Sequence, residues 1–231
     1  MTTDVLSDAA KVAPQPPYRR PIEWPLSWVR TVALILVLCF VAGVIGWRLG
    51  RTAAPSFNNV DVGFLDDMTQ HHNGAIVLAF AYLARGNDPT LTSMAHEIIV
   101  DQAQEISGMS GLLARAGNPS TVGDGISMDW MGHPVVSARM PGLATNADYA
   151  KLRAANPEAA SDQFSRLMIR HHKAGIEMAD YAARYGANSD VKRLAKAMAK
   201  AQRFEVFEMN LRRVALGLKP VHPPTLIGTH L

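Results

Sequence analysis

The chain has 231 residues, of which 48% are hydrophobic and 19% are charged, a composition that excludes a protein disordered throughout. Its formal net charge is +3 and no run of five or six basic residues occurs, so nucleic-acid binding has no support. The single cysteine, Cys39, excludes an intramolecular disulfide framework and a metal site built from cysteines.

The chain begins with a polar, proline-rich stretch that has neither a helical nor a strand period. We expect residues 1–26 to form a disordered cytoplasmic arm. Residues 27–50 follow, with the uncharged run TVALILVLCFVAGVIGW between Arg30 and Arg48. With its flanking tryptophans this run is long and apolar enough to span a bilayer, so we predict a transmembrane anchor or signal-anchor.

The orientation of the anchor is predicted from its basic flanks. Four basic residues precede the apolar run and two follow it, so the positive-inside rule places the main domain outside the cytoplasm, on the periplasmic side. A cleaved signal peptide with a site near Thr52-Ala53-Ala54 is the alternative. The long N-terminal region and Arg48 directly after the run favour an uncleaved anchor.

Two helices in a hairpin are predicted after a linker at residues 51–59. The first helix is expected to end near Arg85 and the second near Ala116. Between them, Gly86-Asn87-Asp88-Pro89 offers a C-terminal cap, an N-cap and a proline for the first helical position. The hairpin therefore covers residues 60–117.

A second hairpin is predicted over residues 157–218. Asn156-Pro157 begins its first helix, Gly186 ends that helix, and Ser189 or Asp190 caps the next one. None of these stretches alternates apolar and polar residues as a strand would. The predicted fold class is therefore all-α, a four-helix bundle over residues 60–218 that follows one transmembrane helix.

The two hairpins are joined by a long, methionine-containing connection, residues 118–156. A short helix is expected in it from Asp148 to Ala155. Connections of this length are usually functional or mobile. Beyond the bundle, residues 219–231 contain three prolines and are predicted to form an extended tail.

The segment around the first histidine pair occurs again 100 positions later, and the register continues without a gap. Met68-Thr69-Gln70-His71-His72 matches Met168-Ile169-Arg170-His171-His172. Further matched pairs are Phe64/Phe164, Gly86/Gly186, Gln102/Gln202, Glu105/Glu205 and Met109/Met209. We interpret this as an internal repeat of about 50 residues, long enough for one helical hairpin.

Each repeat places a methionine sulfur and two histidine ring nitrogens, all possible metal ligands, on one helical turn. Met68 lies three and four residues before His71 and His72, so the three side chains are neighbours on the helix. Imidazole and thioether together are ligands for copper: thioether selects Cu(I), and imidazole suits Cu(I), Cu(II) and zinc. Copper is the predicted metal and zinc the alternative.

The second helix of each hairpin carries a Gln, a Glu and a Met at spacings of three and four residues. Folding of the hairpins is expected to bring this row towards the Met-His-His turn. A glutamate there can accept a hydrogen bond from the ring nitrogen that the metal does not use. The residues predicted to support the ligands in this way are Gln102, Glu105, Gln202 and Glu205.

The same residues also have plain structural interpretations. A His-His pair can be one core histidine held by a Glu beside one exposed neighbour, and a Met stripe at helical spacing is usually core. Repetition at one offset favours the metal interpretation for the histidines. Met109 and Met209 fit either role. Residues expected to serve packing, or given no metal role, are Met94, Met178, Met198, His96, His222 and His230. Residues that fit either a copper-catching loop or a hydrophobic flap are Met128, Met131, His133 and Met140.

The doubled Met-x-x-His-His element, each copy followed by Gln-x-x-Glu-x-x-x-Met, resembles the domain-of-unknown-function family numbered 305 over about residues 57–217. The segment Met140-Pro-Gly-Leu-Ala-Thr145 is similar to the family's linker. The resemblance implies a ferritin-like four-helix bundle outside the cytoplasm and, as in characterised members, copper binding or copper tolerance. One departure is Leu143, which stands where the family commonly has Met. Carried over by position, the implied metal ligands are Met68, His71, His72, Met109, Met168, His171, His172 and Met209.

The function predicted first is a membrane-anchored, extracytoplasmic copper-binding protein that is not an enzyme. Its expected partners are the membrane and a copper donor or acceptor protein or a respiratory membrane complex, and a homodimer fits as well. The alternative is a non-catalytic accessory subunit of a membrane complex. A ferritin-like di-metal oxidase is disfavoured, because no Glu is followed by His three residues later.

Overall fold

The computed structural model describes residues 26–50, 56–118 and 125–221. The predicted segments that lie wholly or mostly outside these residues are the arm 1–26, the linker 51–59 and the tail 219–231 with His222 and His230. The chain divides into two compact units, Met1–Thr52 and Ala53–Leu231.

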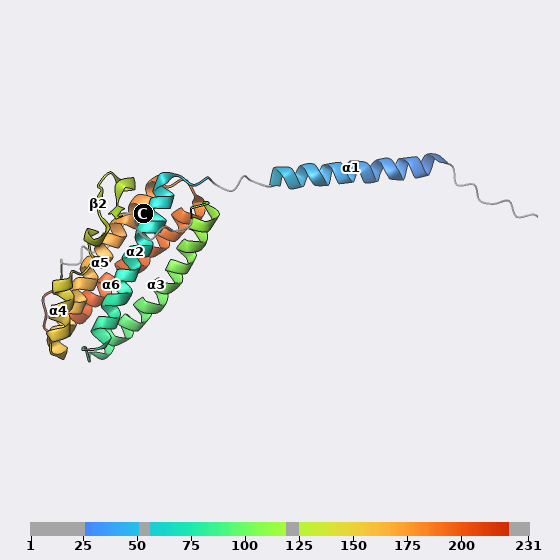
Figure 1. Cartoon of the computed structure of the whole chain (residues 1–231). Helices are drawn as coiled ribbons and strands as arrows, with labels where there is room; N and C mark the ends of the chain where they lie inside the picture. Colours follow the sequence, from blue (N-terminus) through green and yellow to red (C-terminus); the bar gives the residue numbers. More distant parts are fainter. Residues whose placement is uncertain (1–25, 51–55, 119–124, 222–231) are drawn as a thin grey trace, which may run out of the picture. The chain divides into compact units, whose positions relative to one another are not determined.

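The described part of the first unit is one long apolar helix, α1, Leu26–Gly50 (Figure 1). Its stretch Ser27–Arg48 has a mean hydropathy of 2.5, and none of it is buried. Trp28 and Trp47 are exposed near its two ends. By length and composition the helix can cross a membrane, and a signal sequence near an N-terminus has the same properties.

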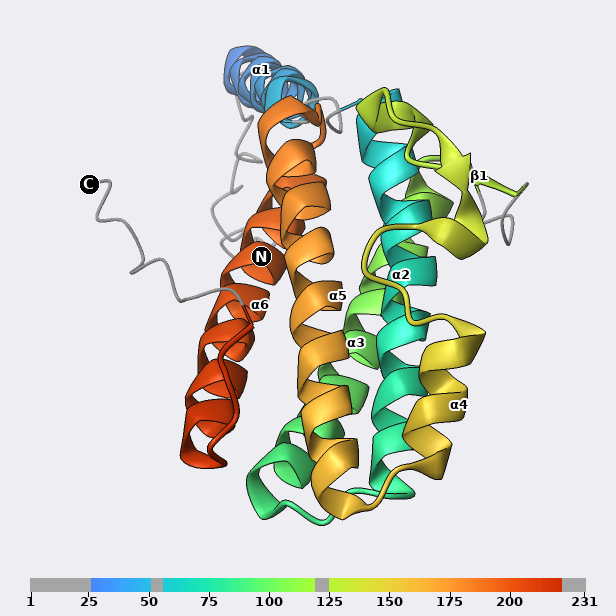
Figure 2. The ribbon, with the colours of Figure 1, turned by 90° about the vertical axis from the view of Figure 1, so that its left-hand side faces the viewer.

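The second unit is built around four long helices. They are α2 (Asn59–Leu83), α3 (Pro89–Arg115), α5 (Pro157–Tyr185) and α6 (Ser189–Ala215). α2 packs along α3 and α5 along α6, and the two hairpins meet mainly through α2 and α5 (Figure 2). A short helix, α4 (Asn146–Ala154), packs against α2 and α5. The predicted all-α four-helix bundle is confirmed.

Polar caps and prolines begin the helices where the sequence predicts them. Asp88 caps α3, its side chain accepting a hydrogen bond from the backbone N–H of Leu91 at 2.9 Å, and Pro89 takes the first helical position. Asn156 caps α5 in the same way, ahead of Pro157. A proline costs little at this position, because the N–H that it lacks has no partner inside the helix.

The prediction for the cap of α6 is wrong by one or two residues. Neither Ser189 nor Asp190 is the N-cap; Asn188 is, and its side-chain oxygen accepts from the backbone N–H groups of Asp190 and Val191. Asn188 is fully buried. The sequence offers three adjacent cap-forming residues, and tertiary packing selects the first of them.

The glycines that end the helices act in two different ways. Gly117 and Gly217 have positive φ angles of 72° and 71°, the left-handed conformation typical of a residue just after a helix. Gly86 has no positive φ. A Cβ atom on it would lie 1.9 Å from a ring carbon of Tyr82, so glycine is required there for close approach.

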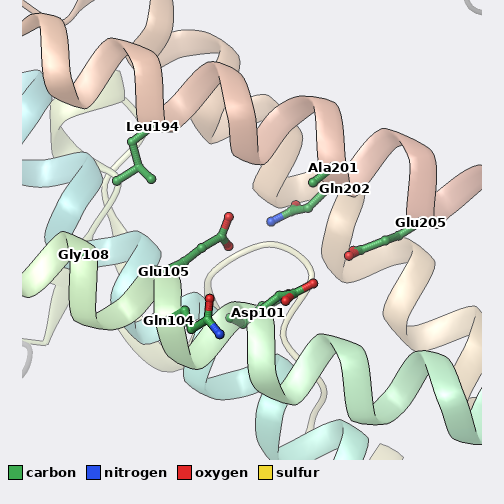
Figure 3. A pocket seen from close by; sticks show the side chains of 9 residues that line it. Asp101, Gln104, Glu105, Gly108, Leu194, Ala201, Gln202 and Glu205 are labelled. Carbon is green, nitrogen blue, oxygen red and sulfur yellow. The ribbon is translucent and has the colours of Figure 1, made fainter.

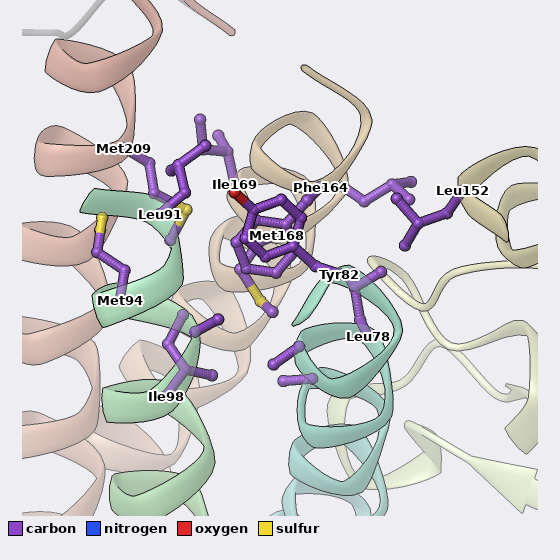
Figure 4. Packing of buried hydrophobic residues seen from close by; sticks show 14 of the residues in the cluster. Leu78, Tyr82, Leu91, Met94, Ile98, Leu152, Phe164, Met168, Ile169 and Met209 are labelled. Carbon is purple, nitrogen blue, oxygen red and sulfur yellow. The ribbon is translucent and has the colours of Figure 1, made fainter. Parts of the chain in front are cut away.

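The buried apolar residues form two clusters. The Tyr82 cluster includes Leu78, Tyr82, Leu91, Met94, Ile98, Leu152, Phe164, Met168, Ile169 and Met209 (Figure 4). The Met68 cluster includes Phe64, Leu65, Met68, Met109, Leu113, Met128, Met140, Met178 and Met198. In the first, the rings of Tyr82 and Phe164 stack with centroids 4.3 Å apart and planes 14° apart. Each fully buried large side chain contributes about 1.5–3 kcal/mol to folding.

The described part of the connection between the hairpins is a small irregular subdomain. It contains the two-residue strands β1 (Ile126–Ser127) and β2 (Val135–Val136), which pair antiparallel. The 3-10 helices η1 (Asp129–Met131) and η2 (Ser137–Arg139) follow the first and the second strand. η1 packs against α2. The connection therefore covers part of the bundle surface.

A buried carboxylate ties the beginning of α2 to the turn between α5 and α6. One oxygen of Asp61 accepts hydrogen bonds from the backbone N–H groups of Asn58, Ala187 and Asn188, at 2.9, 3.0 and 3.0 Å. Asp61 has no exposed surface. Gly186 makes this approach feasible, because a Cβ atom on it would lie 2.5 Å from the other Asp61 oxygen.

Replacing Asp61 with alanine is therefore expected to lower the free energy of unfolding by roughly 2–5 kcal/mol, because three backbone donors lose their acceptor in a dry environment. The matched control is Asp148→Ala, which breaks the capping box of the short helix α4 and its ion pair with Arg170 and should cost about 1 kcal/mol. Urea denaturation of both variants measures the difference. Equal losses would contradict a bridging role for Asp61.

Candidate metal centre

Both histidine pairs lie in the interior of the bundle. His71, His72 and His172 have no exposed surface and His171 is 1% exposed. The rings of His71 and His171 stack across the contact between α2 and α5, with centroids 3.7 Å apart and planes 33° apart. The rings of His171 and His172 lie 5.9 Å apart. The four side chains form one histidine layer, so the interpretation with one exposed histidine in each pair is wrong.

One histidine of each pair is held by a glutamate from the next helix of its hairpin. The Nε2 atom of His72 lies 2.7 Å from a carboxylate oxygen of Glu105, and Nε2 of His172 bonds to Glu205. An ionised carboxylate can only accept, so Nε2 carries the proton and donates it. The lone pair then resides on Nδ1. Neither Nδ1 atom has a hydrogen-bond partner.

The other two imidazoles, those of His71 and His171, contact each other and have no carboxylate partner. Nε2 of His171 donates to the backbone carbonyl of His71 at 2.9 Å, which leaves the lone pair on its buried and unpartnered Nδ1. Neither ring nitrogen of His71 has a partner at full hydrogen-bond geometry, although the nearby backbone of Pro141 partly offsets the lowering of its pKa. The histidine layer thus presents five buried ring nitrogens without a partner.

Burial keeps the central imidazoles neutral. Desolvation, reinforced by repulsion from His72 and His172, lowers the pKa of His71 to about 3. The same causes, with His71 as the nearest repelling ring, lower the pKa of His171 well below 6.5. Neutral imidazole is the form that binds metal ions. At neutral pH the layer therefore offers lone pairs without first releasing protons from these two rings.

The four candidate methionine ligands are fully buried but divide between the two apolar clusters. Met68 and Met109 belong to the Met68 cluster, and Met168 and Met209 belong to the Tyr82 cluster. The hydroxyl of Thr69 lies 4.0 Å from the sulfur of Met109. The fold thus brings the four histidines together, whereas the methionines of the two hairpins lie in different apolar clusters. This favours two His/Met groups that share the histidine layer over one group of eight.

The two glutamines predicted to support the metal ligands are also buried, and they have amide atoms without a hydrogen-bond partner. Gln102 and Gln202 are each 3% exposed. The amide oxygen of Gln102 and both amide atoms of Gln202 have no hydrogen-bond partner. Gln202 reaches α5 opposite Gly175, where a Cβ atom would lie 2.4 Å from its oxygen. These atoms add two amide oxygens to the unpaired donors and acceptors of the core.

The orphaned nitrogens and buried sulfurs fit a soft or borderline metal ion in their chemistry. Within residues 26–50, 56–118 and 125–221, however, no three His, Cys, Asp or Glu side chains already converge as a metal centre. The described bundle therefore gathers the imidazoles in one layer without a finished chelate of these four residue types.

Sequence reasoning missed Asp67, which anchors the connection to the bundle. One oxygen of this buried carboxylate accepts from the backbone N–H of Met128 and from the indole N–H of Trp130, both at 2.7 Å. The Trp130 ring lies against Gly63, where a Cβ atom would be 2.3 Å from it. The only signal in the sequence is a mismatch in the repeat: Leu167 stands at the position equivalent to Asp67.

The connection contributes buried methionines rather than an open loop. Met128 and Met140 are 7% and 3% exposed and belong to the Met68 cluster, whereas His133 is exposed. Gly142, with φ of 87°, lies so close to α5 that a Cβ atom would be 2.8 Å from the Cα atom of His171. Leu143 packs against Gly74. These contacts favour the flap interpretation of the connection.

Comparison with known proteins identifies relatives of this bundle. The profile of the family described as Domain of unknown function (DUF305) matches residues 61–212. No curated protein matches the chain. A DUF305 protein from Streptomyces coelicolor, named as a candidate secreted protein, is 30% identical with a TM-score of 0.64, over 74% of this chain and 100% of the other.

Two further solved structures are similar. A DUF305 fragment from Deinococcus radiodurans is 34% identical with a TM-score of 0.59, over 71% of this chain and 99% of the other. CopM in its Cu(II)-bound form is 25% identical with a TM-score of 0.50, over 67% and 96%. From the profile match and these likenesses, the chain belongs to the DUF305 family.

Proposed function

We propose that this protein binds copper outside the cytoplasm, anchored to the membrane by α1, and sequesters the metal or passes it on without acting on an organic substrate. The observation that carries the proposal is the histidine layer, with five buried ring nitrogens that lack a partner. An unpaired buried polar atom costs about 1–3 kcal/mol. A metal ion bound by those nitrogens would offset that cost.

The ligand types favour copper over harder metals. Each half of the layer has a pair of buried thioethers in the same hairpin, Met68 with Met109 and Met168 with Met209. Thioether selects Cu(I), and imidazole suits both oxidation states of copper as well as zinc. Glu105 and Glu205 hold His72 and His172 with Nδ1 free, the usual task of a carboxylate behind a metal ligand. Support also comes from the similarity to CopM, which has been solved with Cu(II) bound.

The proposed location rests on α1 and its flanks. The helix is apolar over Ser27–Arg48, and the basic residues lie mostly before it, which by the positive-inside rule leaves the bundle outside the cytoplasm. The relative from Streptomyces coelicolor, named as a candidate secreted protein, supports an extracytoplasmic bundle.

A second candidate function, a non-catalytic accessory subunit of a membrane complex, is favoured by one observation. Apolar side chains follow one face of α6 at spacings of three and four residues and are at least 39% exposed. They are Phe204, Phe207, Leu211 and Val214. An exposed stripe of this kind is typical of a contact surface. Under this function the histidines are core residues and no metal binds.

A competitive titration separates the two functions. Full-length protein in mild detergent is titrated with Cu(I) against a chromogenic chelator, and Cu(II) and zinc are titrated in parallel. The proposal expects stoichiometric binding of copper and weaker binding of zinc. Failure to bind any of the three metals would overturn the proposal and favour the accessory subunit.

The methionines are expected to decide the oxidation-state preference. The double variant Met68→Leu/Met168→Leu keeps the core volume, so it should stay folded with a cost of less than about 1.5 kcal/mol per site. It should lose about tenfold in Cu(I) affinity, because two of the four soft sulfur ligands are gone, and keep most of its Cu(II) affinity. Met94→Leu, in the core but outside the ligand set, is the control. Equal losses for both copper ions would contradict sulfur ligation.

A further inference from the structure

A pocket of about 320 Å³ opens between α3 and α6, which contact each other less than α2 and α5 do. Carboxylates from both helices surround it, as Figure 3 shows for Asp101, Glu105 and Glu205. The pocket has a solvent-facing side, since Asp101 is exposed and the side chains of Glu105 and Glu205 are 25% and 21% exposed. It is therefore open to water and negatively charged.

Two buried amides line the inner part of this pocket. Gln102 and Gln202 are among its lining residues, although each is 97% buried. Figure 3 shows the amide group of Gln202 directed into the space that Glu105 faces. Neither amide oxygen has a hydrogen-bond partner. The nitrogen of the Gln202 amide faces that space and its oxygen faces Gly175, so the unpaired oxygen of Gln102 is the amide acceptor available there. A buried, unpaired oxygen in a carboxylate-lined space is suited to a cation, which needs only acceptors.

The charges of the pocket are poorly compensated. Within the described residues, the ion-pair partners of Glu105 and Glu205 are His72 and His172 alone, and Asp101 has none. Burial, with repulsion from Glu205, Glu105 and Glu97, raises the pKa of Asp101. A cation that binds between neighbouring carboxylates relieves their mutual repulsion, and this makes binding favourable.

Two residues that line the pocket also contact the histidine layer. Glu105 and Glu205 each line the pocket and each hydrogen-bond to a buried imidazole. An ion held by these carboxylates would be separated from His72 and His172 by a single side chain. On the opposite side, the α2–α5 contact is closed by the stacked His71 and His171 rings and covered by Gly142 and Leu143.

We propose that the pocket between α3 and α6 is a vestibule in which a hydrated divalent cation binds reversibly to Asp101, Glu105, Glu205 and the amide oxygen of Gln102 before it reaches the histidines. The proposal deepens the copper-binding function and rests on it. Water ligands are exchanged for oxygen ligands, with no change of oxidation state. Carboxylate and amide oxygens suit this weak, fast step, and the nitrogen and sulfur ligands retain the ion afterwards.

The rate of copper loading tests the vestibule. Full-length protein in detergent is mixed with Cu(II) in a stopped-flow instrument, and quenching of tryptophan fluorescence is followed. Asp101→Asn should load about three- to tenfold more slowly at low salt, and the difference should shrink at high salt. Glu177→Gln removes the same charge from an exposed site on α5 and should load at the wild-type rate. Equal rates for both variants would overturn the vestibule.

Binding in the pocket is measured separately with Mn(II), a paramagnetic ion that prefers oxygen ligands. In protein labelled with ¹⁵N at glutamine side chains, sub-stoichiometric Mn(II) should broaden the amide signals of Gln102 and Gln202 before that of Gln163, which lies on α5 and does not line the pocket. Asp101→Asn should weaken the effect. No selective broadening would overturn the vestibule even where copper binds. Broadening without retention of copper would instead contradict the proposed function.

Discussion

Replacing His72 and His172 together with alanine is expected to lower the copper affinity of the protein by at least about a hundredfold, since loss of an outer partner of a metal ligand alone costs about 10–100-fold. Each replacement removes an imidazole whose Nε2 is held by a glutamate and whose Nδ1 is buried without a partner. The measurement is the chelator competition with Cu(I) and Cu(II).

The control variant is His96→Ala, because His96 is exposed and bonds only to the Thr92 carbonyl of its own helix. Its copper affinity should equal that of the wild type. Since alanine leaves Glu105 and Glu205 without their partners, the variant pair His72→Gln and His172→Gln provides a second test with a polar side chain retained. Folded variants that still bind copper at full strength would show that the ligands lie elsewhere.

The stability of the metal-free bundle is expected to fall steeply as the pH is lowered from about 6.5 towards 4.5. The folded-state pKa of His71 is lowered to about 3 and that of His171 well below 6.5, while the unfolded chain takes up protons near 6.5. Between these values the unfolded state binds more protons, so the free energy of unfolding decreases with falling pH. The slope is about 1.4 kcal/mol per pH unit for each imidazole.

Denaturant unfolding at several pH values in this window measures the slope. His71→Gln should reduce it by about half. The control is His96→Gln, an exposed position whose side chain bonds only to its own helix, and it should leave the slope unchanged. Asp88, Asp148 and Asp190 have lowered pKa values, so the stability that their carboxylates contribute is lost mainly below this window, as the pH falls through the carboxylate range. A stability that is flat from pH 6.5 to 4.5 would mean that the two rings are not buried neutral groups.

Local signals account for what could be predicted from the sequence. Helical periodicity, the Gly-Asn-Asp-Pro break and the Asn-Pro pair gave the four bundle helices, because these residues act within one turn of where they stand. The same local reasoning could not choose among three adjacent cap-forming residues at the start of α6. There the choice depends on the backbone N–H of Asn188, which binds Asp61 from the other hairpin.

Features that depend on long-range contacts could not be predicted. Adjacent residues of a helix point about 100° apart, so periodicity alone expects one of His71 and His72 to be exposed. Both are buried because α2 is covered by α3, by α5 and by the connection. The contact of Asp67 with Met128 and Trp130 likewise joins positions more than 60 residues apart, with no marker beyond a broken repeat.

The most direct test of the copper site is nuclear magnetic resonance of the four imidazoles with and without Cu(I), a diamagnetic ion. In the metal-free protein, Nε2 of His72, His171 and His172 should carry the proton and Nδ1 should be unprotonated. On addition of Cu(I), the Nδ1 signals of His72 and His172 should shift to the metal-bound range while Nε2 remains protonated. Unchanged Nδ1 signals at full copper loading would contradict a copper site in the histidine layer.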